Sequence, residues 1–204
     1  WPGAALALSA LAHLGLLAGL MALLAPRLWR DPDRRHLSFL WVLLLLAGVD
    51  VALYLDALRG ISPARWLHVL VGVFMALVVI AMSRISMSIV NASIDELAAR
   101  QGEELAPYLA RPPRRNLALL TIGLFTLAEF WRAGGPVSGW LALAAACALL
   151  NLLNDWHVGR PLLGRWPLML YAVFLLMAGG YALIGVAVLG GAFSPNASLH
   201  LLTT

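Results

Sequence analysis

Six long apolar runs, separated by short polar segments, divide the chain. They cover approximately residues 2–25, 37–58, 66–91, 116–131, 137–155 and 166–190. Most of these runs approach the roughly 20 residues that an α-helix needs to cross the hydrocarbon core of a bilayer. Because backbone N–H and C=O groups in lipid must be paired within their own segment, we expect each run to form a transmembrane helix.

A seventh apolar run begins near Ala197 and continues to the last residue of the chain, Thr204. A helix that ended in the middle of a bilayer would leave its terminal backbone groups without partners. We therefore expect the chain to be a piece of a longer membrane protein.

The run from Trp66 to Asn91 combines the most apolar part of the chain with a polar end. Its first half contains one histidine, His68, and no formal charge. Arg84, Ser88 and Asn91 then follow at spacings of four and three residues, which places them on one face of a helix. A guanidinium group is costly in hydrocarbon, so Arg84 must pair, reach the membrane surface or face a protein-lined interior.

Charged side chains inside the other apolar runs are candidate functional groups for the same reason. Asp50 lies deep in the second run, where it can act as a proton-relay group or, as we favour, as the ion-pair partner of Arg84. Glu129 precedes Arg132 by three residues, a spacing that favours a local ion pair. The histidine of the first run, His13, is interpreted as a packed and hydrogen-bonded residue rather than a ligand.

The segment after the third run predicts a separate surface helix. Ser93 and Glu96 fit the S-x-x-E pattern that caps a helix N-terminus. Residues 93–110 then place apolar side chains roughly on one side, which is typical of an amphipathic helix lying at the membrane interface. Prolines at 112 and 113 end this helix.

The composition agrees with an integral membrane protein. The chain has 204 residues, of which 62% are hydrophobic and 12% charged, whereas a soluble domain has about 45–50% apolar and about 25% charged residues. We predict an all-α transmembrane bundle, in one domain over residues 1–204, with six complete spans, the start of a seventh and one interfacial amphipathic helix. The single cysteine, Cys147, offers no intrachain disulfide, and the sequence has no P-loop, zinc-protease or nucleophile-elbow motif.

The arginines predict the orientation of the spans. The loops after the first, third and fifth runs contain four, four and two arginines, and the other loops contain at most two, one and none. The positive-inside rule therefore places residue 1 on the outer side of the membrane. This distribution explains the basic net charge of +4 through membrane topology, so no nucleic-acid partner is expected.

The orientation brings two histidines to a similar depth. His68 and His200 each follow shortly after the chain enters the membrane from the outer side. Imidazole is a suitable ligand for iron and copper, so this pair can ligate a metal ion or a haem iron.

Three stretches of the chain resemble the NnrS family of bacterial membrane proteins. They are RNLALLTIGLFTLAEFW at 115–131, LMLYAVFLLMAGGYALIGVAVL at 168–189 and NASLHLLTT at 196–204. The stretch from Arg84 to Asn91 is similar to a further family region, with Met87 where the family has a proline. The resemblance extends over nearly the whole chain in the order of its spans.

The resemblance implies a haem- and copper-containing, multi-pass protein of the bacterial inner membrane, with roughly twelve spans in full. It implies a role in the response to nitric oxide and nitrosative stress, associated with denitrification. His200 carries over as a candidate haem or metal ligand, with His68 as its possible partner. Arg84 and Asn91 carry over as a polar part of the cofactor site, where Arg84 can neutralise a haem propionate. Whether the protein is an enzyme stays open.

A transporter or channel is the alternative function. In that case the four charged residues of the apolar runs would line a polar path: Asp50, Arg84, Glu129 and Asp155.

Overall fold

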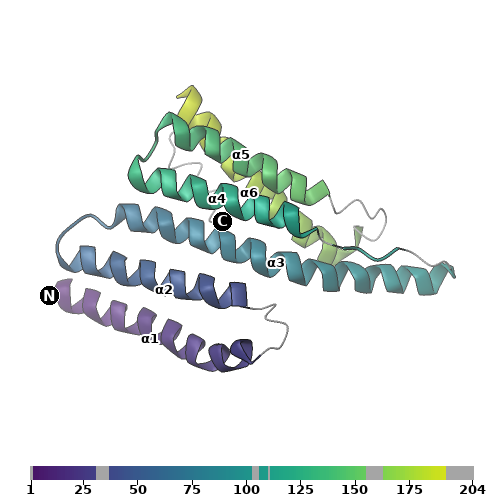
Figure 1. The fold of residues 1–204 in the computed structure, drawn as a ribbon, viewed down its shortest axis with the longest axis horizontal. Coiled ribbons are helices and arrows are strands. Elements are labelled where there is room, and N and C mark those ends of the chain that lie inside the picture. The colour runs from purple at the N-terminus through teal and green to yellow at the C-terminus, as the bar shows by residue number, and fades with distance from the viewer. Residues whose placement is uncertain (1, 31–36, 103–105, 110, 155–162, 192–204) are drawn as a thin grey trace.

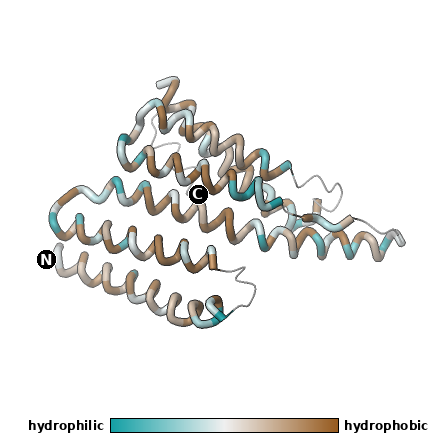
Figure 2. The backbone as a smooth tube through the Cα atoms, viewed as in Figure 1, coloured by the Kyte–Doolittle hydropathy of each residue, from teal (hydrophilic) through white to brown (hydrophobic). Residues whose placement is uncertain are grey.

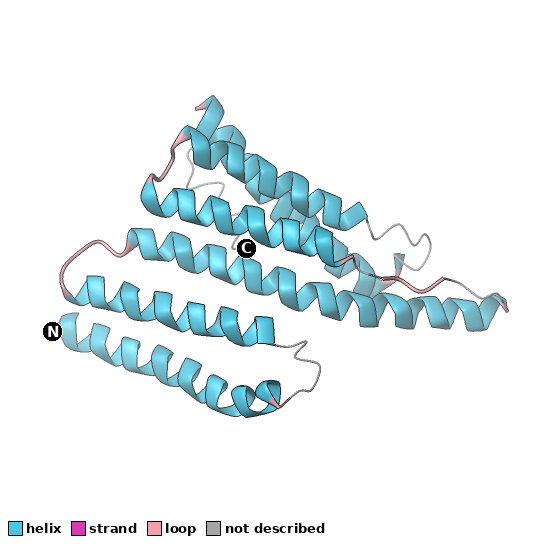
Figure 3. Ribbon diagram, in the orientation of Figure 1, coloured by secondary structure: helices cyan, strands magenta, loops and turns pink. Residues whose placement is uncertain are grey.

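The computed structural model is a bundle of antiparallel α-helices joined by short connections (Figures 1 and 3). The structure describes residues 2–30, 37–102, 106–109, 111–154 and 163–191. Within these residues the helices are α1 (Pro2–Trp29), α2 (Leu37–Leu58), α3 (Ala64–Gln101), α4 (Pro112–Trp131), α5 (Pro136–Leu153) and α6 (Arg165–Gly190). The predicted all-α fold is therefore confirmed.

Five of the helices in the described residues are long and apolar enough to cross a membrane: α1, α2, α3, α5 and α6. Figure 2 shows hydrophobic residues along most of each helix and hydrophilic residues mainly near the helix ends. The remaining helix, α4, has 20 residues and carries Arg114, Arg115 and Glu129, which makes it less apolar. The structure supports five of the six predicted complete spans, and the predicted start of a seventh at Ala197 lies outside the described residues.

Helix α3 is longer than any predicted span. Its 38 residues correspond to about 57 Å at a rise of about 1.5 Å per residue, nearly twice the thickness of a hydrocarbon core of about 30 Å. Figure 1 shows the C-terminal part of α3 extending past the ends of the neighbouring helices. The helix ends only where Gly102 adopts a left-handed conformation, with φ of 68°.

This continuity overturns the predicted interfacial helix at residues 93–110. The Ser93 hydroxyl donates to the carbonyl of Ile89 at 3.1 Å, so it bonds within an uninterrupted helix instead of capping a new one. Glu96 pairs with Arg100 one turn later, at 2.6 Å. No glycine or proline occurs between residues 73 and 101 to end the helix, and the apparent capping box is simply part of α3.

The core of the bundle lies between α3, α4, α5 and α6. Each helix contributes a side chain with no exposed area: Val79, Ile122, Leu149 and Phe174. Helices α5 and α6 approach most closely where glycines face each other. A Cβ on Gly185 would lie 2.9 Å from the carbonyl oxygen of Gly139, so only a residue without a side chain fits there.

Helices α1 and α2 form a hairpin at the edge of this core. Helix α2 packs on α3, and α1 packs on α2 at the outer edge of the bundle (Figure 1). Most of the α1 surface is exposed, with Leu8, Leu11, Leu16 and Leu23 each about 70% exposed or more. Because α1 and α3 flank α2, the three helices enclose a groove.

Candidate functional site

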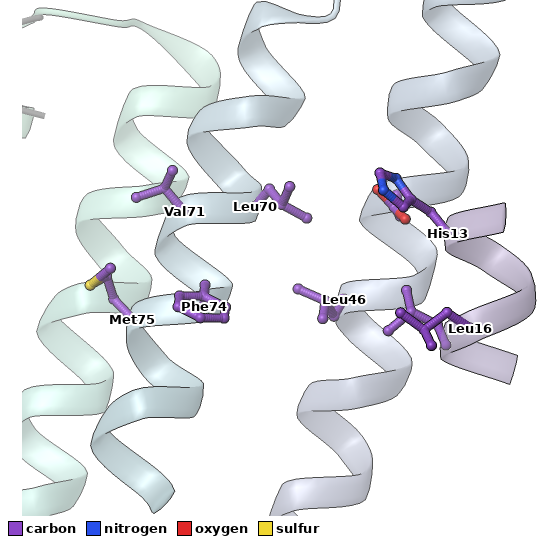
Figure 4. A pocket seen from close by; sticks show the side chains of 9 residues that line it. His13, Leu16, Leu46, Leu70, Val71, Phe74 and Met75 are labelled. Atoms are coloured by element: carbon purple, nitrogen blue, oxygen red, sulfur yellow. The ribbon is translucent and has the colours of Figure 1, made fainter. Parts of the chain in front are cut away.

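A cavity of about 420 Å³ lies between α1, α2 and α3. It is lined by His13, Leu16 and Leu17 of α1, by Leu46 and Asp50 of α2, and by Leu70, Val71, Phe74 and Met75 of α3. In Figure 4, Leu70 and Phe74 face Leu46 across the cavity, and His13 and Leu16 form the wall beyond it. We call this cavity the α1–α3 groove.

A hydrogen-bonded chain fixes the histidine of this groove. The Tyr54 hydroxyl lies 2.6 Å from His13 Nδ1 and 3.2 Å from the Ser9 hydroxyl. Tyr54 is buried and belongs to α2, whereas Ser9 and His13 lie one turn apart on α1. The bonds therefore join the two helices. They engage Nδ1 of His13, as we expected for a hydrogen-bonded histidine. The second ring nitrogen, Nε2, takes no part in these bonds.

Asp50 lines the same groove one helical turn before Tyr54. Asp50 is buried, with 8% of its surface exposed. Among the described residues, the ion pairs join Arg65 to Asp56 and Arg100 to Glu96, and neither includes Asp50. The groove therefore contains a buried carboxyl group that takes part in neither of these two ion pairs.

The predicted ion pair between Asp50 and Arg84 does not form. The α3 residues that line the groove together with Asp50 lie between Leu70 and Met75. Arg84 is nine residues further along the same helix, which corresponds to about 14 Å. Arg84 is half-buried and has an interaction partner of its own. The prediction failed because an antiparallel hairpin pairs residues at equal distances from the turn, and these two residues are at different distances.

The other predicted cofactor residues lie in different places. His68 is half-buried in the second turn of α3, near the turn that joins α2 to α3. It precedes the α3 residues that line the α1–α3 groove and is not one of them, and its predicted depth near the outer boundary stays a prediction. His200 lies outside the described residues.

The Asn91 side chain binds backbone. Its Nδ2 donates to the carbonyl of Tyr108 at 3.1 Å, and its Oδ1 accepts from the N–H of Tyr108 at 2.7 Å. Both polar atoms of the Asn91 side chain thus bind the segment that follows α3 and hold it against this helix. The structure gives Asn91 a positioning role, and its predicted contact with a cofactor stays a prediction.

Glu129 also binds backbone rather than its predicted partner. Its Oε1 accepts a hydrogen bond from the N–H of Gly134 at 3.1 Å, in the turn after α4. In the described part of the chain it forms no ion pair with Arg132. A carboxylate near the end of α4 is thereby used to close the turn into α5.

The α1–α3 groove is a candidate small-molecule site. The described residues contain no group of three or more His, Cys, Asp or Glu side chains that could hold a metal ion. The α1–α3 groove instead combines apolar walls with an imidazole and a carboxylate, the usual composition of a ligand pocket. The sequence indicated His13 and Asp50 one by one. It did not indicate that they share a cavity, because the packing of α1 on α2 brings them together.

The length, the apolar composition and the antiparallel packing of the helices define a multi-pass membrane protein. The chain belongs to the NnrS family: the family model described as NnrS protein matches residues 1–204, the whole chain. No curated protein and no solved structure matches it. The family predicted from the sequence is therefore confirmed.

Proposed function

We propose that this chain acts as an NnrS-like haem–copper protein of the bacterial inner membrane, in the response to nitric oxide and nitrosative stress that accompanies denitrification. The match of the family model to the whole chain is the observation that carries this proposal. The membrane-spanning helices support a multi-pass location.

His68 is half-buried in the second turn of α3, close to the turn between α2 and α3. A half-buried imidazole in an apolar helix supports its proposal as a haem ligand. We propose His68 and His200 as the residues that would hold a haem iron, with Asn91 positioning the neighbouring chain. Arg84 lies 16 residues beyond His68 on the continuous helix α3, about 24 Å away, so it would meet only a group bound toward the other end of that helix. When bound, haem would supply an iron at which a diatomic ligand such as nitric oxide binds in place of one of the two histidines. The described residues offer no complete ligand group for copper, so its ligands are to be sought in the rest of the protein.

Absorption spectra of the full-length protein in detergent test this function. We expect a Soret band that changes on addition of nitric oxide, and that shifts or disappears in His200→Ala and His68→Ala. His36→Ala, a loop histidine on the opposite side of the membrane by the arginine rule, is the matched control and should leave the band unchanged. A folded protein without a Soret band after expression with ample haem would contradict the proposal.

The transporter alternative receives less support. Asp50 lines the α1–α3 groove, whereas the Glu129 carboxylate closes the turn after α4. Arg84 lies about 14 Å along α3 from the groove, and Asp155 lies outside the described residues. The described members of the group thus occupy separate environments and do not outline a common path.

A further inference from the structure

We propose that the α1–α3 groove binds a lipid-soluble hydroxyaromatic molecule with the chemistry of a quinol. Its ring hydroxyls bond to His13 and Asp50, and its apolar part lies along the leucine-lined walls. This inference goes beyond the proposed haem–copper function and does not depend on it.

The walls of the groove select an apolar and flat ligand. Leu46 of α2 and Leu70 of α3 face each other across the cavity, and Leu16 and Phe74 extend its two sides (Figure 4). An aromatic ring placed between these side chains can pack against the Phe74 ring, and within a bilayer this contact stabilises the complex through van der Waals packing. A volume of about 420 Å³ lies within the range of small-molecule sites, roughly 300–1,000 Å³.

The polar end of the groove selects hydrogen-bond donors. The Tyr54 hydroxyl already engages His13 Nδ1, so a ligand meets the imidazole at Nε2. The Asp50 carboxylate is an acceptor when ionised. A ligand hydroxyl that donates to this carboxylate forms a charge-assisted hydrogen bond, which is stronger than a bond between neutral groups. The Ser9–Tyr54–His13 chain holds the ring in place before the ligand arrives.

The groove is open toward the lipid. Leu16 on one side and Phe74 on the other are 72% and 51% exposed, although both line the cavity. In a membrane-spanning bundle such an opening faces the bilayer, where an apolar ligand with a hydrocarbon tail is dissolved. A ligand can therefore enter sideways, place its polar ring at Asp50 and leave its tail in the membrane.

Hydroxyl donors suit this groove better than a bare metal ion. The cavity offers one imidazole and one carboxylate, whereas metal sites in proteins use three or four protein ligands. The remaining lining is hydrocarbon apart from the thioether of Met75. A hydroxyaromatic ligand satisfies both polar groups and fills the apolar volume at the same time.

Binding of a fluorescent quinol analogue tests the inference. The probe is heptyl-hydroxyquinoline N-oxide, titrated into the purified full chain in nanodiscs, with quenching of its fluorescence as the readout. We expect saturable binding at one site per chain. Asp50→Leu and His13→Phe replace the carboxyl and the imidazole by larger apolar side chains without hydrogen-bonding atoms, and each should raise the Kd about tenfold, equivalent to roughly 1.4 kcal/mol.

A third variant blocks the volume and leaves the polar groups intact. Leu70→Trp fills the groove from α3 and should abolish saturable binding. The matched control is Leu127→Trp, which fills a second apolar cavity of about 380 Å³ between α2, α3 and α4 that has no histidine or carboxylate in its lining. Circular dichroism and gel filtration of each variant check that it is folded.

Several results would overturn the inference. Equal quenching by the wild type and by all variants would mean that the probe only dissolves in the lipid. A loss of binding in Leu127→Trp but not in Leu70→Trp would assign the ligand to the second cavity. Displacement of the probe by one Zn²⁺ per wild-type chain, absent in Asp50→Leu, would assign the groove to a metal ion. The Soret band of the same samples is read separately, so failure of the haem proposal does not affect this test.

Discussion

At the residue scale, neighbouring side chains bind the carboxylate of Asp56 at the end of α2. Its Oδ2 accepts from Arg65 at 2.8 Å and from the Trp66 indole N–H at 2.7 Å, across the turn between α2 and α3. The Arg65 guanidinium also lies over the rings of Trp66 and Phe130, at 5.4 Å and 5.6 Å. One carboxylate thus ties together the end of α2, the start of α3 and the end of α4.

Replacing this carboxylate should destabilise the bundle. Asp56→Asn removes the charge that orients Arg65 and weakens the bond to Trp66, so we expect a lower Tm in detergent, followed by tryptophan fluorescence. Glu96→Gln is the matched control, because its ion pair with Arg100 is exposed and such pairs contribute little to stability. An equal change in Tm for both variants would show that the carboxylate does not hold the turn.

The residue scale also shows what the sequence can predict. The sequence identifies Asp50 and His13 as unusual because polar groups are rare in apolar runs, and this requires no knowledge of packing. It does not identify their partners. The Tyr54–His13 bond depends on which faces of α1 and α2 meet, and the distance between Asp50 and Arg84 depends on the register of the α2–α3 hairpin.

At the scale of elements, hydrophobic runs predicted helix positions well and helix ends less well. The run at 37–58 coincides with α2, because charged residues precede it and Arg59 and Gly60 follow it. Helix α3 passes beyond its apolar run, since polar residues such as Glu96 and Arg100 are good helix formers and nothing interrupts them. In α3 the end of the apolar run and the end of the helix therefore differ, and the helix continues to the left-handed Gly102.

The chain after α3 depends on Asn91, and its exchange behaviour tests that dependence. Asn91→Leu removes the acceptor of the Tyr108 N–H and the donor to its carbonyl. We expect the Tyr108 amide to exchange with solvent deuterium about tenfold faster or more, as measured by hydrogen-exchange mass spectrometry. Ser88→Ala, an exposed position one turn earlier on α3, should leave the exchange unchanged. Unchanged exchange in Asn91→Leu would show that other contacts hold this segment.

Two glycines of α6 should respond in opposite ways to the same substitution. A Cβ at Gly185 would lie 2.6 Å from Leu143 Cγ and 2.9 Å from the Gly139 carbonyl, so Gly185→Ala should lower the free energy of unfolding by about 1–3 kcal/mol. A Cβ at Gly179 meets nothing within 4 Å. Gly179→Ala should therefore be neutral or stabilise the helix by up to about 1 kcal/mol. Denaturant titration in mixed micelles measures both, and equal effects would contradict the close packing of α5 and α6.

At the scale of the whole molecule, the membrane topology depends on α4. It is less apolar than the other helices, yet it packs antiparallel between α3 and α5 and reaches a similar length to α5. Its charged residues lie in its first and last turns, where side chains can reach the membrane surface. The sequence predicted a span at residues 116–131, and α4 packs between two span-length helices, so a measurement of topology decides whether it crosses the membrane.

Reporter fusions at Gly102 and Gly134 test this topology. If α4 crosses the membrane, the fusion after residue 102 should be cytoplasmic and the fusion after residue 134 should lie on the outer side, in accordance with the arginine distribution. A fusion at Gly60, in the turn between α2 and α3, is the control for the outer side. Activity of the 102 and 134 reporters on the same side would show that α4 lies along the membrane surface.

The extension of α3 has a mechanical consequence. Helix α3 is continuous from the α2–α3 turn to Gly102. It therefore borders the α1–α3 groove near its N-terminal end and projects from the bundle at its C-terminal end. A small tilt of α3 at the groove would therefore displace its C-terminal end sideways by a larger distance. A spin label at the tip would therefore report events at the groove from a position outside the membrane.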